Sequence, residues 1–291
     1  MLELDLRGPS GEPVDLRRTL ASHGVASLPP NRVDEDAPAL ETTVRVPRGA
    51  PRTVRVSPGR PGHAAVEVVG RETRTVLPPL RRILNLDEDL APFYAVAADD
   101  PDLAWAARGA GRMVRGQTVF EDVVKTICTT NCAWSGTVRM VSALVDHLGE
   151  PAAGGRGRAF PTQAAMAEAD DAFYRDVVRA GYRGAYLRSL AVSVADGDLD
   201  LEALLDPALP DEEVSARLLV LPGVGPYAAA HAMMLLGRHS RLILDSWTRP
   251  TYARLAGRKA SDVQIERRFR RYGPYAGLAF WLFLTRGWVE E

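Results

Sequence analysis

The chain has 291 residues, of which 46% are hydrophobic and 25% are charged, and this composition is ordinary for a globular protein. Its 37 acidic and 36 basic residues leave a net charge of -1, which excludes a strongly basic nucleic-acid-coating protein and an acidic disordered tail. The two cysteines, Cys128 and Cys132, are too few for a disulfide framework, a four-cysteine zinc site or a cysteine-ligated iron–sulfur cluster.

The pattern of apolar residues predicts neither a membrane span nor an export signal. No stretch approaches the 18 uninterrupted apolar residues that a membrane-spanning helix needs. The first ten residues lack the basic segment and apolar run of a secretory signal. We therefore expect a cytoplasmic protein without a membrane partner.

The first 80 residues are predicted to be rich in β-strands. Segments 43–46, 53–57 and 64–69 carry β-branched residues, and clusters of proline and glycine separate them, as is typical of antiparallel strands. From Leu80 onward the periodicity is helical, with helices expected at 161–169 (Pro161 at its start), 170–180, 187–195 and 211–220. The sequence thus predicts an α+β fold with a β-rich domain at 1–82 and a mostly helical region at 83–291.

Cys128 and Cys132, four residues apart, are expected to be buried core thiols.

Residues 211–237 are predicted to form a helix, a tight turn and a second helix. Gly223 and Gly225 permit a sharp reversal and leave backbone N–H groups uncovered. The second helix begins at Pro226, a position where proline is tolerated. Its free N–H groups favour an anion such as one phosphate of a nucleic-acid backbone. A Gly-x-Gly turn by itself is weak evidence, because most such turns only join two packed helices.

A single carboxylate, Asp245, follows the second helix after an apolar segment and precedes a further helix. Capping a helix N-terminus is a very common role for aspartate. Such a cap is compatible with a chemical role, because it would hold the side chain in place near the glycine turn.

These motifs resemble the helix-hairpin-helix (HhH-GPD) DNA glycosylase superfamily. Residues 221–229, Leu-Pro-Gly-Val-Gly-Pro-Tyr-Ala-Ala, followed about twenty residues later by Asp245, are similar to its signature. Segments 120–131, 181–186 and 272–279 resemble, in order, the helix that faces the orphaned base, the wedge of 8-oxoguanine DNA glycosylases and their pocket helix. The β-rich start resembles the accessory domain of this family and of 3-methyladenine DNA glycosylase II. The resemblance runs from about 110 to 285 and implies two lobes, one at 119–208 and one at 209–291 together with 83–118.

The resemblance implies a base-excision-repair enzyme that flips a damaged base out of double-stranded DNA, close to the nucleoid. It implies that Asp245 is the catalytic carboxylate, which stabilises the oxocarbenium-like sugar of the transition state. It also implies a monomer without a cofactor, apart from Na⁺ or K⁺ on the backbone carbonyls of Leu219, Leu221 and Val224. The DNA contacts that it implies are Gly223, Gly225, Asn131, Tyr182, Arg183 and Arg249.

The sequence departs from the family pattern at three pocket positions. Bifunctional relatives have a lysine where this chain has Tyr227, and a phenol cannot form a Schiff base, so we expect a monofunctional hydrolase. Trp247 and Phe280 stand where 8-oxoguanine enzymes often have histidine and a polar base-reading residue. With Trp281 they predict an aromatic lesion pocket suited to a cationic alkylated base, although the same rings are equally typical of a core. His231 is expected to be a partly buried structural histidine.

Two other functions remain open at this point. A diverged 8-oxoguanine glycosylase is favoured by segments 182–183 and 273–277 and opposed by the three pocket departures. A non-catalytic protein that binds damaged DNA would keep the same scaffold. A small-molecule enzyme is disfavoured, because the chain has no P-loop, dinucleotide-binding glycine motif or Ser–His–Asp arrangement.

Overall fold

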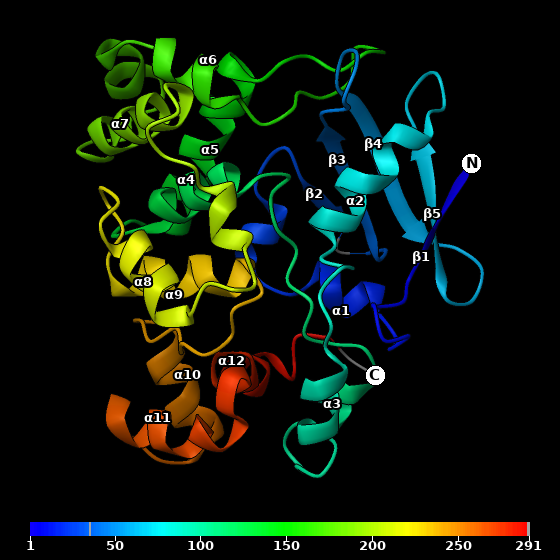
Figure 1. The fold of residues 1–291 in the computed structure, drawn as a ribbon, viewed down its shortest axis with the longest axis vertical. Helices are drawn as coiled ribbons and strands as arrows, with labels where there is room; N and C mark the ends of the chain where they lie inside the picture. Colours follow the sequence, from blue (N-terminus) through cyan, green and yellow to red (C-terminus); the bar gives the residue numbers. More distant parts are fainter. Residues whose placement is uncertain (35, 290–291) are drawn as a thin grey trace.

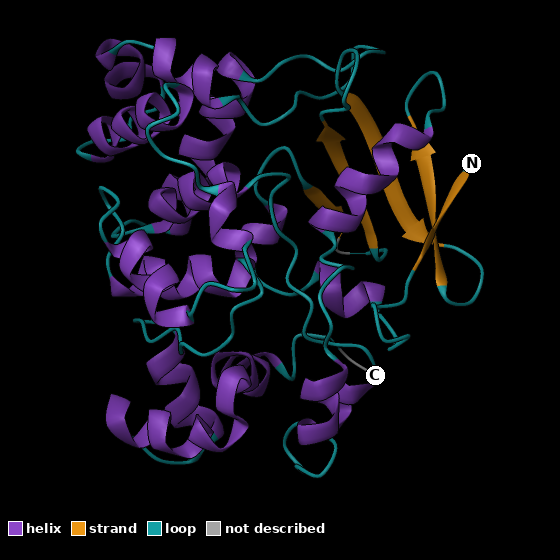
Figure 2. Cartoon of the chain, in the orientation of Figure 1, coloured by secondary structure: helices purple, strands orange, loops and turns teal. Residues whose placement is uncertain are grey.

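A computed structural model describes residues 1–34 and 36–289, and it has a β-sheet beside a mostly helical body (Figures 1 and 2). All neighbouring strands of the five-stranded sheet are antiparallel, in the order β1-β5-β4-β3-β2. Thr42 pairs with Val54, and Val56 pairs with Val66. The strands are β1 (Leu2–Asp5), β2 (Arg32–Asp34), β3 (Ala39–Val44), β4 (Arg52–Pro58) and β5 (His63–Val68).

The three predicted strands correspond to the three inner strands of this sheet, and the expected α+β class is confirmed. Their apolar residues form a core with helices α1 (Leu16–Leu20) and α2 (Leu77–Ile83), and Figure 1 shows α2 lying across the sheet. The two edge strands were not predicted. This core extends past the boundary expected at residue 82, because Ile83, Leu84, Leu86 and Val114 belong to it.

The helical body forms two further apolar cores. One joins α4, α5, α7, α8 and α9, and the other joins α3 to α9, α10, α11 and α12. Figure 1 shows α8 and α9 between the α4–α7 helices and the α10–α12 helices. The α-helices are α1 (Leu16–Leu20), α2 (Leu77–Ile83), α3 (Ala91–Ala97), α4 (Val119–Thr129), α5 (Trp134–Leu148), α6 (Gln163–Glu168), α7 (Arg183–Ala195), α8 (Asp211–Leu219), α9 (Pro226–Leu235), α10 (Thr248–Leu255), α11 (Asp262–Phe269) and α12 (Ala276–Thr285).

Two predicted helices differ from the structure. Helix α6 begins at Gln163 and not at Pro161, because the Thr162 side chain accepts the Ala165 amide at 3.1 Å and caps the helix there. Segment 170–180 contains a π-helical turn, Phe173–Val177, in which the Val178 amide reaches back to the Phe173 carbonyl. Arg179, with φ +56°, ends this segment. No helix among the described residues has the length and hydropathy to cross a bilayer.

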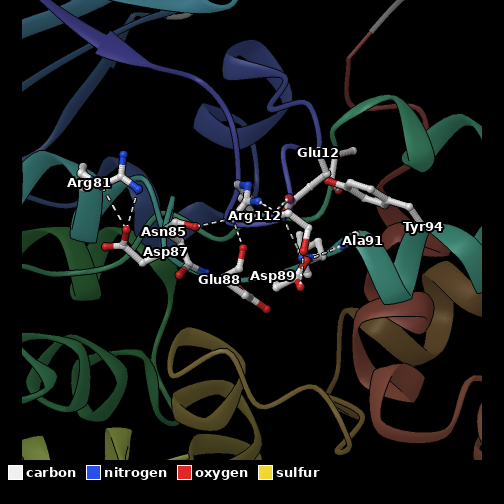
Figure 3. Close-up of polar contacts among 12 residues, drawn as sticks. Glu12, Arg81, Asn85, Asp87, Glu88, Asp89, Ala91, Tyr94 and Arg112 are labelled. Carbon is white, nitrogen blue, oxygen red and sulfur yellow. Dashed lines mark hydrogen bonds and ion pairs between the residues drawn. The ribbon is translucent and has the colours of Figure 1, made fainter.

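A buried arginine ties the first residues of the chain to the helical body. The Arg112 guanidinium donates to Glu12 Oε1 at 2.6 Å, and to the carbonyls of Asn85 and Glu88 at 2.6 and 2.7 Å (Figure 3). Glu12 Oε1 also accepts the Leu90 amide at 3.1 Å, just before α3. Breaking one partner of such a buried pair costs several kcal/mol, about 3–5, so this junction holds the segment after β1 against the segments that flank α3.

Candidate active site

Helices α8 and α9 are joined by a tight turn at 220–225, as the sequence predicts. Gly223 has φ +82°, and a Cβ there would lie 2.7 Å from Cδ2 of Tyr186, so no other residue fits without strain. The first backbone bond of α9 runs from the Ala229 amide to the Gly225 carbonyl at 2.9 Å. The amides that precede it at the start of α9 are therefore available to an anion.

The carboxylate of Asp245 caps the turn that leads into α10. Its Oδ1 accepts the amides of Trp247 and Thr248 at 2.8 and 2.7 Å, and the Thr248 hydroxyl accepts the Asp245 amide at 2.8 Å. This reciprocal arrangement fixes the side chain, as the sequence analysis expects. The second carboxylate oxygen, Oδ2, has no hydrogen-bond partner among residues 1–34 and 36–289.

Asp245 and the glycine turn line one cleft of about 990 Å³. The cleft is bounded by α9, by the segment from the end of α4 to the start of α5, by the end of α12 and by the stretch after α1. Besides Asp245, the sequence predicts ten residues of the lesion pocket and the DNA interface. Seven of them line the cleft: Gly223, Gly225, Tyr227, Trp247, Trp281, Asn131 and Tyr182.

Three tryptophans form one wall of the cleft. Trp247 is 40% exposed, and its ring centroid lies 5.7 Å from that of Trp281 and 5.6 Å from that of Trp288. Trp281 is held by a 2.7 Å bond from its Nε1–H to the Ser22 carbonyl. Tyr227 lies close by, and burial raises the pKa of its phenol, which therefore stays uncharged at neutral pH. The wall provides ring faces and few hydrogen-bonding groups.

Phe280 does not line the cleft, and its placement in the lesion pocket is wrong. Its side chain is fully buried and packs against Phe269 and Tyr252, with ring centroids 5.3 and 6.3 Å away. Consecutive residues of a helix point about 100° apart. When Trp281 faces the cleft, Phe280 consequently faces the core between α10, α11 and α12.

Tyr182 and Asn131 lie together at the edge of the cleft. Tyr182 is 54% exposed, and its hydroxyl accepts the Asn131 side-chain N–H at 3.2 Å. Arg183 does not line the cleft. It is buried, its guanidinium donates to Thr130 and lies 4.6 Å from the Tyr182 ring. Arg183 thus holds the loop that carries Tyr182 and, contrary to expectation, does not face the cleft.

Arg249 also lies outside the cleft lining, on α10. It forms two hydrogen bonds with Asp262 at 2.8 and 2.9 Å, and this partner raises the pKa of the guanidinium. At the hairpin, the Leu221 carbonyl accepts the Val224 amide at 3.1 Å, and Leu219 is the last residue of α8. The side chains of Leu221 and Val224 are buried in the core that α8 and α9 share with α4, whereas Leu219 is 44% exposed.

Several residues that line the cleft were not predicted. Cys132 is exposed, contrary to expectation, because α4 ends at Thr129 and releases it from the core, whereas Cys128 is buried. Trp288 follows α12, and Trp134 begins α5 and packs over Gly24. His23 and Val25 come from the N-terminal part. No local pattern marks these residues, because each belongs to the cleft through a contact that is distant in sequence.

No metal-binding cluster of three or more His, Cys, Asp or Glu side chains occurs in the described part of the chain. Of the two lysines, Lys125 is buried, binds Glu121 at 2.6 Å and donates to the Leu28 carbonyl. Lys259 lines a separate surface hollow with Arg258 and Arg267.

Comparison with known proteins settles the fold. No family model matches the chain. A 3-methyladenine DNA glycosylase from Archaeoglobus fulgidus superposes over 100% of both chains, with a TM-score of 0.75 and 20% identity. The chain has the fold of the helix-hairpin-helix DNA glycosylases. An 8-oxoguanine glycosylase/lyase from Clostridium acetobutylicum has the same fold, with a TM-score of 0.72 and 20% identity over 93% of this chain and 92% of that one.

One protein with a similar sequence is also named as a DNA repair enzyme. The probable bifunctional transcriptional activator/DNA repair enzyme AlkA of Mycobacterium tuberculosis is 29% identical over 199 residues, which are 66% of this chain and 38% of that protein. The chain therefore matches well under half the length of this relative. The observed fold agrees with the family that the hairpin motif resembles.

Proposed function

We propose that this protein is a monofunctional DNA glycosylase that hydrolyses the N-glycosidic bond of a damaged base flipped into the cleft. The observation that carries the proposal is the position of Asp245. Its carboxylate is fixed beside a glycine turn with free amides, in a cleft that also contains Tyr227 and a tryptophan wall.

DNA would bind along the mouth of the cleft. The amides at the start of α9 suit one phosphate without reading sequence, while Gly223 keeps the turn open for close approach. The exposed Tyr182 ring, held by Asn131, suits insertion into the space that the flipped nucleotide leaves. The base would then enter the cleft and stack on Trp247 and Trp281.

Asp245 would stabilise the developing charge of the sugar. One carboxylate oxygen is committed to the Trp247 and Thr248 amides, so the side chain cannot swing away. The other oxygen is available to the oxocarbenium-like transition state or to the attacking water. A fixed charge aimed at the sugar needs no reorganisation during the reaction.

The chemistry of the amines supports hydrolysis and not lyase activity. Tyr227 occupies the position of the lyase lysine, and its phenol cannot form an imine. Lys125 is buried in an ion pair, and Lys259 is in another surface hollow. A Tyr227→Lys variant tests the geometry: we expect a borohydride-trapped DNA adduct from the variant and none from wild type. A trapped adduct with wild type would contradict the monofunctional assignment.

An alkylated base fits the cleft best. Aromatic faces attract a cationic ring, and three tryptophans with mutual ring distances of 5.6 to 6.0 Å supply those faces. The deciding experiment measures free base released from duplexes that contain 3-methyladenine, 7-methylguanine, 8-oxoguanine, hypoxanthine or uracil. We expect release of the methylated bases. Release of 8-oxoguanine alone would favour a diverged 8-oxoguanine enzyme, and tight binding without release would favour a non-catalytic damage-binding protein.

We also propose that the protein acts as a monomer.

We further propose that the hairpin carbonyls of Leu219, Leu221 and Val224 hold a monovalent cation beside the bound phosphate. The Leu221 carbonyl keeps one lone pair after accepting the Val224 amide. The cation site is tested by measuring the affinity for abasic-site DNA in KCl, NaCl and tetramethylammonium chloride at equal ionic strength. Equal affinity in all three salts would contradict a cation site.

A further inference from the structure

Two histidines from distant parts of the sequence meet at the bottom of the cleft. His23 follows α1, and His231 lies on α9 one turn after Tyr227. They are 4% and 5% exposed, and their rings meet edge to face with centroids 5.8 Å apart. The His231 ring also meets the Tyr227 ring, at 6.0 Å. The lining of the cleft therefore includes a pair of buried imidazoles.

One hydrogen bond fixes the tautomer of His23. Its Nε2 lies 2.7 Å from the Val114 carbonyl, which can only accept, so Nε2 carries the hydrogen. The other nitrogen, Nδ1, is then a lone-pair acceptor. Nδ1 is buried, and it has no hydrogen-bond partner within the described residues.

His231 is left without any hydrogen bond. Both of its ring nitrogens are buried and unpartnered across the described chain. Leaving a buried polar group unpaired costs free energy, about 1–3 kcal/mol, and such groups usually have a partner. Burial lowers the pKa of His231 to about 4 and that of His23 to about 3, so both rings are neutral at pH 7. His231 then offers one donor and one acceptor.

We propose that His23 and His231 form the base-reading floor of the cleft and select an alkylated aminopurine. The His23 Nδ1 atom accepts an N–H of the exocyclic amine, and the His231 N–H donates to the neighbouring ring nitrogen. This proposal deepens the proposed function and rests on it for the flipped nucleotide.

The chemistry of the floor favours an aminopurine that carries positive charge. An amine on a cationic ring donates a charge-assisted hydrogen bond, which is stronger than a neutral one. The neutral His23 ring accepts that bond without repelling the charge, and the tryptophan wall attracts the same cationic base from the side. The floor thus supplies the hydrogen-bonding specificity that the aromatic wall lacks.

The experiment replaces each imidazole by a ring of similar shape without nitrogens. We expect His23→Phe and His231→Phe to lower kcat/KM for 3-methyladenine release by about ten- to hundredfold, as for a lost buried hydrogen bond. Affinity for abasic-site DNA, which has no base to read, should remain within twofold. His147→Phe is the matched control, because His147 is exposed on α5 and contacts Phe173 outside the cleft lining.

A second measurement does not need catalysis. In ¹⁵N-histidine NMR spectra we expect His23 as the Nε2–H tautomer, and we expect free 3-methyladenine to shift the His23 and His231 nitrogen resonances but not those of His147. A 3-methylpurine without the amine should leave His23 Nδ1 unshifted. Unchanged His23 and His231 resonances at saturating 3-methyladenine would refute the proposal that these two rings bind the base.

The outcomes separate this proposal from the proposed function. If wild type releases no base from any duplex, the glycosylase assignment fails, and the NMR titration still tests the floor. If wild type releases 3-methyladenine and both phenylalanine variants do so within twofold of its rate, the floor fails and the glycosylase stands. Variants impaired only on hypoxanthine would overturn the choice of an aminopurine.

Discussion

Replacing Asp245 by asparagine removes its charge and keeps its structural role. The Asn side-chain oxygen still accepts the Trp247 and Thr248 amides, which bind Oδ1 in the structure. Asp245→Asn therefore should fold as wild type and bind abasic-site DNA with nearly unchanged affinity. Asp245→Ala differs, because it also removes the cap, which costs about 1 kcal/mol of stability.

The expected loss of rate follows from the charge that Asp245 would present to the sugar. Two unit charges about 4 Å apart attract by about 4 kcal/mol at an effective dielectric constant of about 20. Since about 1.4 kcal/mol corresponds to tenfold in rate, Asp245→Asn should slow base release by about a thousandfold. The reaction is measured under single-turnover conditions on the best duplex of the lesion panel.

A second carboxylate on the same side of the fold provides the control. Asp262 binds Arg249 at the surface and does not line the cleft, so Asp262→Asn removes an equal charge without touching the site. Its rate should remain within twofold of wild type. If Asp245→Asn releases base within tenfold of the wild-type rate, the assignment of Asp245 as the catalytic carboxylate is wrong.

Three further predictions concern the wedge, the hairpin and a buried acid. Tyr182→Ala should lower base excision about tenfold or more through lost stacking with an unchanged melting temperature, since the ring is half exposed; an unaltered excision rate would contradict the wedge. Gly223→Ala should lower both the melting temperature and the affinity for abasic-site DNA, because φ is +82° and Tyr186 blocks the Cβ; Gly257→Ala, with φ +68° and open space, should alter stability alone. Asp122 is buried, which raises its pKa from 3.8 to about 7. Its contribution to stability is complete below pH 4 and is lost as the pH rises through 7, so Asp122→Asn should melt higher than wild type at pH 8 and similarly at pH 4; equal melting at both values would refute this sign.

Local patterns in the sequence were sufficient for the hairpin and its aspartate. Gly223 and Gly225 signal a turn by their backbone freedom, and Asp245 signals a helix start by its capping chemistry. Both signals depend on neighbours within a few residues. The three inner strands were predicted for the same reason, whereas β1 and β2, with four and three residues, are too short to show a period.

The two histidines of the cleft and Trp288, one of the three tryptophans of its wall, could not be predicted. His23 and His231 meet through the packing of the N-terminal part on α9, and nothing near either residue records that contact. For Phe280 and Trp281 the sequence indicated the right segment but not which of the two rings faces the cleft. That depends on how α12 is rotated against α10 and α11. Helix rotation is decided by packing and not by local sequence.

The Arg112 junction has a consequence for the way the protein would meet its ligand. The cleft is lined by residues from distant parts of the chain, since His23 follows α1 and Asp245 lies between α9 and α10. If the segment that carries Glu12 moved away from Arg112, the arginine would be left as a buried charge without its partner. The cavity would accordingly be pre-organised, so that in the proposed reaction the free energy of DNA association would be spent on extruding the nucleotide and not on assembling its receptacle.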